Sequence, residues 1–64
     1  MDMGKKIKLL LVDDEEEFAS SSSQALGRRG FEVSLALNGV TALEMVDKQT
    51  YDAIVLDVKM PDID

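Results

Sequence analysis

The stretch KIKLLLVDD, residues 6–14, decides how the rest of the chain folds. It begins with alternating charged and apolar residues, is continuously apolar over residues 9–12, and stops at two acids. A run of this kind is typical of a strand that is buried on both faces, as strands of a parallel sheet are. We therefore predict a strand over residues 6–12, with Asp13 and Asp14 just beyond its carboxyl end.

Two further segments also predict strands. Residues 31–36, FEVSLA, alternate between apolar and polar side chains, as in a strand with one exposed face at a sheet edge. Residues 51–57, YDAIVLD, have a centre that is apolar on both faces, like the first strand. We predict strands over both of these segments.

The segment between the first two strands carries the end signals of a helix. Asp14 and Glu17 have the spacing of a capping box, and the glutamates between them suit the first turn of a helix. A basic pair then precedes Gly30, the residue type favoured just after a helix. We predict a helix over residues 15–29.

This predicted helix has a thin apolar stripe, formed by Phe18, Ser22, Ala25 and Leu26. The four consecutive serines at residues 20–23 weaken the prediction, because serine competes with the helix for backbone hydrogen bonds. A flexible serine linker is therefore the alternative for this segment.

A second helix is predicted over residues 39–49, where apolar residues recur with helical period. Asn38 stands before it as the candidate N-cap. The order of elements is then βαβαβ. Alternation of this kind indicates an α/β fold with a parallel sheet and right-handed crossovers.

The composition excludes several classes of function. The 64 residues contain no cysteine and no histidine, so a disulfide framework or a Cys/His zinc site is excluded. The net charge of −6 argues against nucleic-acid binding by this segment, because phosphate backbones demand cations. The longest apolar run near the N-terminus is too short to cross a membrane. We expect a cytoplasmic domain with no membrane contact.

The acids at the strand ends form the candidate site. Parallel strands place their carboxyl ends at one edge of the sheet, so Asp13 and Asp14 would lie beside Asp57 if the first and third strands are neighbours. Each pair of like charges about 4 Å apart would repel by roughly 4 kcal/mol at an effective dielectric of about 20. Either one carboxyl is protonated or a hard cation, Mg²⁺ or Mn²⁺, enters the cluster. The alternative is that these aspartates only cap a helix and end a strand.

The same residues resemble a known family. Residues 9–15 (LLLVDDE), the pair at residues 38–39 (NG) and residues 51–61 (YDAIVLDVKMP) closely resemble the receiver domain of two-component response regulators. The resemblance implies a flavodoxin-like, doubly wound parallel sheet with strand order 2-1-3. Residues 1–64 would then be the N-terminal half of a receiver-like domain.

The resemblance also implies roles for individual residues. Asp57 would be the phosphoacceptor, receiving a phosphoryl group from a histidine kinase or a phosphotransfer protein. Asp14 would ligate Mg²⁺ directly and Asp13 mostly through water, with Asp57 and the main-chain carbonyl of Lys59 completing the set. Such a module is not an enzyme, beyond assisting its own phosphorylation.

A complete receiver continues with two further strands, which supply a hydroxyl residue and a lysine to the phosphoryl site. We therefore expect residues 1–64 to be inactive alone. The open edge of the third strand also predicts a homodimer, or pairing with a complementing C-terminal half. One alternative is a structural, self-associating fragment without phosphotransfer. Another is a Mg²⁺-dependent aspartyl phosphohydrolase, although that class usually has an aspartate at the position of Lys59.

Overall fold

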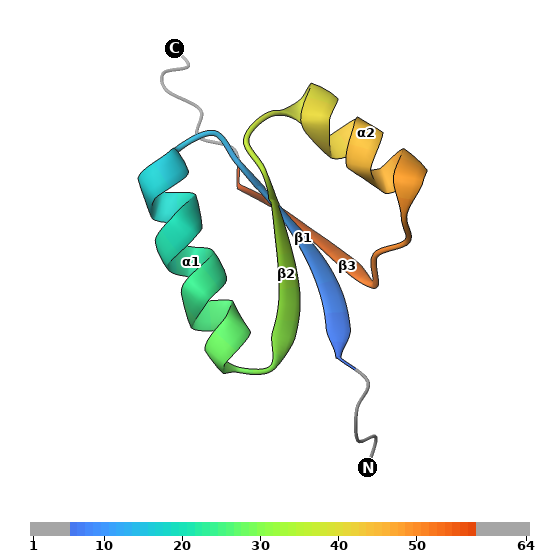
Figure 1. Cartoon of the computed structure of the whole chain (residues 1–64). Coiled ribbons are helices and arrows are strands. Elements are labelled where there is room, and N and C mark those ends of the chain that lie inside the picture. The colour runs from blue at the N-terminus through green and yellow to red at the C-terminus, as the bar shows by residue number, and fades with distance from the viewer. Residues whose placement is uncertain (1–5, 58–64) are drawn as a thin grey trace.

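A computed structural model describes residues 6–57 of the chain (Figure 1). The elements follow the predicted βαβαβ order: β1 (Ile7–Asp13), α1 (Glu16–Arg28), β2 (Phe31–Ala36), α2 (Gly39–Lys48) and β3 (Ala53–Asp57). Each observed boundary lies within two residues of the predicted one, and β2 matches the prediction at both ends.

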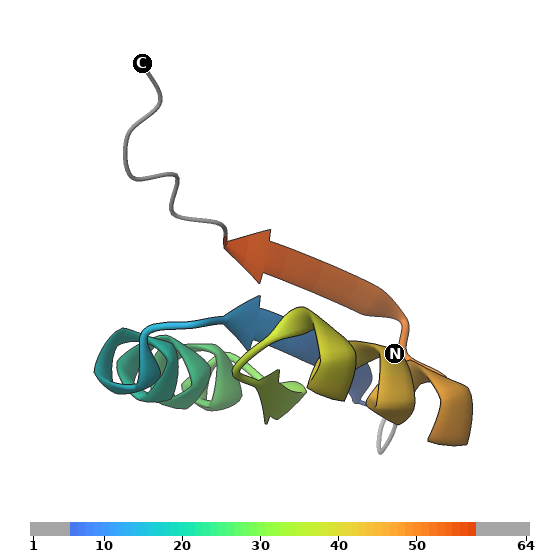
Figure 2. The ribbon, with the colours of Figure 1, turned by 90° about the horizontal axis from the view of Figure 1, so that it is seen from above.

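The three strands form one parallel sheet in the order β2-β1-β3, which confirms the predicted fold. Leu9 of the central strand pairs with Val33 of β2 on one side and with Ala53 of β3 on the other. Helices α1 and α2 lie on opposite faces of the sheet, and β3 lies beyond both of them (Figure 2). The sheet is therefore doubly wound, with β1 at its centre.

Residues of β1 form most of the buried core. Leu10 is fully buried and packs with Val12 and with Ala36 of β2, while Ala42 and Met45 of α2 cover them. The intervening leucines of β1 are also buried, because side chains alternate between the two faces of a strand. The continuous apolar run of β1 thus packs against a helix on each face of the sheet, as the sequence predicts.

The predicted start of α1 is wrong in its details. The N-cap residue is Glu15, and its side chain makes no capping hydrogen bond, so Asp14 does not form a capping box with Glu17. Instead, a carboxylate oxygen of Asp13 accepts a hydrogen bond from the backbone N–H of Glu15 at 3.0 Å. The acid that ends β1 therefore also fixes the turn into α1.

The predicted apolar stripe of α1 is also partly wrong. Phe18 is 52% exposed and Ala25 is exposed, whereas Ala19 is fully buried against the sheet. A small residue at this position lets the helix backbone approach the strands closely. The four serines are helical, and Ser23 donates a hydrogen bond to the carbonyl of Ser20 at 3.2 Å, so the flexible-linker alternative is wrong.

Two predicted turn signals are confirmed. The side-chain oxygen of Asn38 accepts a hydrogen bond from the backbone N–H of Thr41 at 2.8 Å, which is the geometry of an N-cap. Gly30 follows α1 with a φ of 102°, a conformation that strongly favours glycine.

Asp52, placed in the third strand by the sequence, instead precedes β3 and accepts a hydrogen bond from the N–H of Lys8 at 2.9 Å.

The left-handed conformation of Gly30 leads to a test of the α1–β2 connection. Gly30→Ala should lower the free energy of unfolding by about 1–2 kcal/mol, because a Cβ is strained at this φ. Gly27→Ala, inside α1, is the matched control and should raise the stability by about 0.5–1 kcal/mol. Both positions are open, so no steric clash intervenes. Urea unfolding at one fixed protein concentration measures both, and similar effects of the two substitutions would contradict the assignment.

Candidate functional site

A hollow of about 280 Å³ lies at the carboxyl edge of the sheet. We call it the acidic pocket. Its lining residues come from the ends of β1 and β3 and from the turn between β2 and α2: Val12, Asp13, Asp14, Leu37, Asn38, Gly39, Leu56 and Asp57. The three aspartates that the sequence singles out therefore share one pocket.

Asp13 is the buried acid of this pocket. Its side chain is 1% exposed, and one carboxylate oxygen, Oδ1, accepts the hydrogen bond from the N–H of Glu15. The other oxygen, Oδ2, is buried and has no hydrogen-bond partner among the described residues. A buried carboxylate oxygen without a partner is costly, so this atom requires an explanation.

Asp57 reaches the pocket from the neighbouring strand. It pairs with Asp13 in the register of β1 and β3, so the two backbones lie only one strand spacing apart, about 4.8 Å. Asp57 is half-buried, whereas Asp14, the next residue after β1, is exposed. The pocket thus holds one buried, one half-buried and one exposed carboxylate.

The connection between β2 and α2 forms the third wall. Asn38 and Gly39 line the pocket together with Leu37, which is 38% exposed. The sequence marks Asn38 only as a helix cap, and its amide oxygen does serve that purpose. The sequence also contained a reason to expect Asn38 in the pocket. Residues just after β2 must lie at the same edge of the parallel sheet as residues just after β1.

The donor set of the acidic pocket suits a hard cation. Carboxylate oxygens without His or Cys are the ligands that Mg²⁺ or Mn²⁺ prefers, and the unpaired Asp13 oxygen offers a ligand or an acceptor for a bound water. However, no three acidic, His or Cys residues within residues 6–57 converge closely enough to form a ready-made metal group. Lys59 lies outside the described residues. The metal site therefore stays a prediction.

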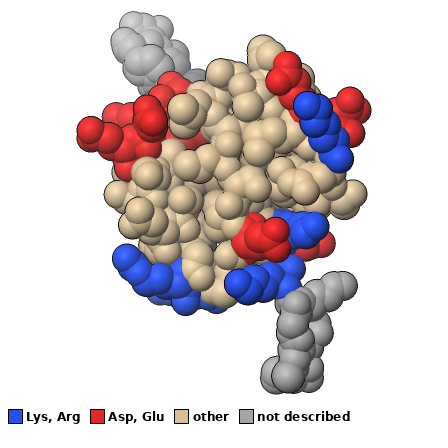
Figure 3. All heavy atoms as spheres, viewed as in Figure 1, with Lys and Arg blue, Asp and Glu red and all other residues tan. Residues whose placement is uncertain are grey.

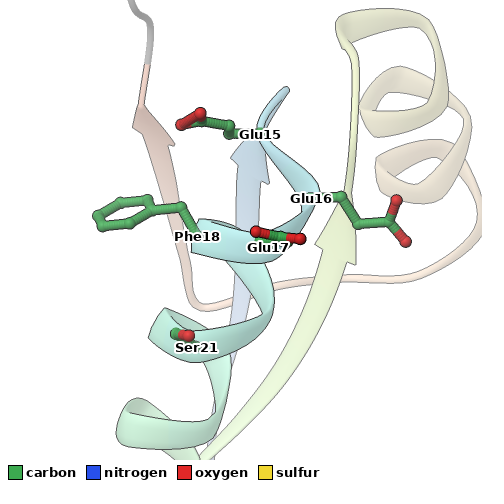
Figure 4. Close-up of a pocket in the computed structure, with 5 residues that line it drawn as sticks. All are labelled: Glu15, Glu16, Glu17, Phe18 and Ser21. Atoms are coloured by element: carbon green, nitrogen blue, oxygen red, sulfur yellow. The ribbon is translucent and has the colours of Figure 1, made fainter.

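Negative charge gathers at this end of the molecule. Figure 3 shows acidic side chains gathered over the start of α1, whereas most of the basic side chains lie along the opposite, lower edge, where they alternate with acidic ones. A second hollow, of about 570 Å³, lies on the outside of α1 between Glu15, Glu16, Glu17, Phe18 and Ser21 (Figure 4). Its wall is the first part of a single helix, so it brings no strand ends together. We place the candidate site in the acidic pocket.

Comparison with known proteins agrees with the fold. The family model for the response regulator receiver domain matches residues 9–64. The chain belongs to this family. Receiver domains are signalling modules of two-component systems, so the predicted class of function is confirmed at this level.

The relatives include response regulators from mycobacteria. The chain is 45% identical over 58 residues to the response regulator MprA of Mycobacterium leprae (strain TN), which covers 91% of this chain and 25% of the relative. It is 43% identical over 58 residues to MprA of Mycobacterium ulcerans (strain Agy99), with the same coverage. The chain thus spans about a quarter of the length of these curated relatives. No solved structure matches it.

The two described helices do not meet the requirements of a membrane span. Within residues 6–57, neither has the length and apolar character needed to cross a bilayer.

The unpaired oxygen of Asp13 leads to a test without any metal. Asp13→Asn keeps the acceptor for the Glu15 N–H but removes a buried charge. In the presence of a chelator it should therefore raise the free energy of unfolding by about 1–3 kcal/mol. Asp14→Asn, at an exposed position, should change it by less than about 0.5 kcal/mol. If Asp13→Asn instead lowered the free energy of unfolding in urea, the Asp13 carboxylate would have to be stabilised by other interactions in the folded chain, which would contradict this prediction.

Proposed function

We propose that this chain is the phosphoacceptor segment of a response regulator, with Asp57 as the residue that receives the phosphoryl group. The observation that carries the proposal is the pairing of Asp57 with the buried Asp13 across two parallel strands, at the edge where ligands bind to such sheets. Asp57 is half-buried and lines the pocket, so its carboxylate remains accessible to a donor. The family supports this role, because the chain matches its model through Asp57 and beyond.

The proposed reaction is a transfer between two side chains. A carboxylate oxygen of Asp57 attacks the phosphorus of a phosphohistidine on a histidine kinase or a phosphotransfer protein. The P–N bond breaks, a P–O bond forms, and the product is an acyl phosphate on Asp57. The imidazole nitrogen leaves with the electron pair of the P–N bond, so no further reactant is required. Such a transfer depends mainly on positioning and on charge neutralisation.

The electrostatics of the pocket make a cation necessary for this reaction. Asp57 carries negative charge among other carboxylates, and the incoming phosphoryl group is also anionic. A bound Mg²⁺ or Mn²⁺ would supply the positive charge that offsets this repulsion. Asp14 would hold the ion directly and Asp13 mostly through water. Asp57 and the main-chain carbonyl of Lys59 would complete the ligand set.

We propose further that residues 1–64 are not phosphorylated by themselves. Among the described residues, the lining of the pocket contains carboxylates but no lysine, Ser or Thr to bind the phosphoryl oxygens. Those groups would come from strands that complete a receiver sheet. In this proposal the module acts in the cytoplasm as a switch and not as an enzyme that turns over a substrate.

Phosphorylation tests the role of Asp57. Residues 1–64 would be joined to the residues that complete a receiver domain in a relative, and then incubated with Mg²⁺ and acetyl phosphate. Mass spectrometry should show one added phosphoryl group, which Asp57→Asn abolishes and the control Asp47→Asn preserves. The 64-residue chain alone should remain unmodified.

Two other results would contradict this proposal. Labelling that survives Asp57→Asn would remove Asp57 as the phosphoacceptor. Sustained release of phosphate from an ester substrate would instead indicate the alternative of a phosphohydrolase.

Thermal unfolding tests the cation site independently. Millimolar Mg²⁺ should raise the melting temperature of the 64-residue chain, because an ion that binds only the folded state stabilises it by mass action. A gain of about 1 kcal/mol corresponds to about 4–8 °C in a domain of this size. Asp14→Asn should remove the shift, whereas Asp47→Asn, on the exposed part of α2, should retain it. An equal shift in both variants would indicate a general salt effect.

A further inference from the structure

Asp52, which directly precedes β3, is joined to the first part of β1 by two hydrogen bonds. Its carboxylate oxygen Oδ2 accepts a hydrogen bond from the backbone N–H of Lys8 at 2.9 Å. Its own backbone N–H donates to the carbonyl of Lys8 at 2.8 Å. One residue of the chain that enters β3 therefore binds both backbone groups of Lys8. We call this pair of hydrogen bonds the Asp52 clamp.

The Asp52 clamp depends on which residue lies beside Lys8. In a continuous parallel ladder a backbone carbonyl would accept the N–H of Lys8, and any residue type could supply that carbonyl. Here a side chain supplies the acceptor, so the residue type matters. Of the two neighbours of Asp52 along the chain, Ala53 has no polar side-chain atom, and the hydroxyl of Tyr51 accepts a hydrogen bond from Gln49. The clamp is therefore specific for one register.

The apolar residues of β3 do not specify the register by themselves. Residues 53–56 are all apolar, and Ile54, Val55 and Leu56 are 54%, 41% and 64% exposed. A slip by one or two positions would exchange one apolar side chain for another on either face, with little change in the apolar surface that is buried. Among the described residues, β3 also pairs with β1 alone. The register of β3 therefore needs a polar contact that does not tolerate a slip.

The register of β3 decides where Asp57 lies. Beyond the Asp52 clamp, the residue pairs of β1 and β3 run from Leu9 with Ala53 to Asp13 with Asp57. A slip of one residue would turn Asp57 to the other face of the sheet. A slip of two would move it about 7 Å along the strand, since a strand rises about 3.3 Å per residue. Either change would separate the carboxylate of Asp57 from Asp13.

We propose that Asp52 is a positioning residue, which fixes the register of β3 and thereby holds Asp57 opposite the buried Asp13. It acts from the far end of β3 and does not line the acidic pocket. Its importance for phosphotransfer rests on the function proposed above for Asp57, whereas its effect on the register rests on the two hydrogen bonds of the clamp. Phosphoryl transfer depends on positioning, and a displacement of about 1 Å can lower a rate by roughly 100-fold.

Substitution of Asp52 tests the clamp in a completed domain, that is, residues 1–64 joined to the residues that complete a receiver domain in a relative. Asp52→Ala removes the acceptor for the N–H of Lys8, whereas Asp52→Asn keeps a side-chain oxygen there. With Mg²⁺ and acetyl phosphate, Asp52→Ala should be labelled at least about tenfold more slowly than the wild type. Asp52→Asn should restore most of the rate. Asp47→Ala, which removes an exposed acid from α2, should leave the rate unchanged.

Nuclear magnetic resonance measures the register directly, in the completed domain without a phosphoryl donor. Nuclear Overhauser contacts between the backbone protons of Asp13 and Asp57 should be present in the wild type and in Asp52→Asn, because these residues are paired. The same contacts should be lost or broadened by exchange in Asp52→Ala.

A further control separates the register from general stability. Gly30→Ala weakens the fold at the α1–β2 connection, away from β3, so it should keep both the contacts and the rate of phosphorylation. Circular dichroism confirms the fold of each variant. If Asp52→Ala is unfolded, it is combined with Gly27→Ala, which stabilises α1.

Three results would overturn the proposal. The first is an Asp52→Ala domain that keeps the contacts between Asp13 and Asp57. The second is a normal rate of phosphorylation after those contacts are lost. The third is Asp52→Asn behaving like Asp52→Ala, which would show that charge matters and the hydrogen-bond acceptor does not. A wild-type domain that accepts no phosphoryl group would instead remove the function proposed for Asp57, while the Overhauser contacts would still decide whether Asp52 fixes the register.

Discussion

The parallel pairing of β1 with strands on both its sides is the constraint on which the rest of the structure depends. It buries the leucines of β1 under two helix layers, and it forces the residues that end β1 and β3 to the same edge. Asp13 and Asp57 are therefore neighbours because of strand direction and register, without any direct attraction between them. The acidic pocket follows from the same pairing that builds the core. A change in the register of β3 by one residue would turn Asp57 to the other face of the sheet and dismantle the pocket while leaving the helices in place.

Within this pocket, burial and charge oppose each other. Asp13 is the most buried charged residue in the described part of the chain, and only one of its oxygens has a hydrogen-bond partner there. The hydrogen bond to the N–H of Glu15 explains one benefit of the aspartate, because it fixes the turn from β1 into α1. It does not explain the second oxygen. A buried carboxylate oxygen without a partner, beside other carboxylates, offers a ligand to the cation of the proposed function. The proposed binding of a cation would thus compensate the buried, unpaired oxygen of Asp13.

The sequence was sufficient for the elements, their order and the identity of the pocket acids. These rest on local signals: the apolar run of β1, the Asn38 cap and the glycine after α1. Prediction failed where the outcome depends on how a helix is rotated against the sheet. Phe18 looks like a core residue in the sequence, but the small Ala19 fits the close approach of α1 and Phe18 is turned outward. The capping box also failed, because the helix begins one residue later than predicted, with Glu15 in place of Asp14 as the N-cap. Leu37 and Gly39 were not expected in the pocket, since their position depends on the crossing of β2 and α2 and not on their residue types.

The position of β3 connects the open edge to the site. Its sequence has the composition of a central strand, whereas its place in the described structure is at the edge, paired only with β1 and covered by neither helix. Asp57 is the last residue of that strand, so it has less packing to hold it than Asp13, which lies at the buried end of β1. Any strand that pairs with the open edge would add backbone hydrogen bonds to β3 and cover its apolar side chains. It would thereby restrict Asp57 to one position relative to Asp13. A strand that completes the sheet beside β3 would therefore also organise the acidic pocket, because β3 carries Asp57 at its end.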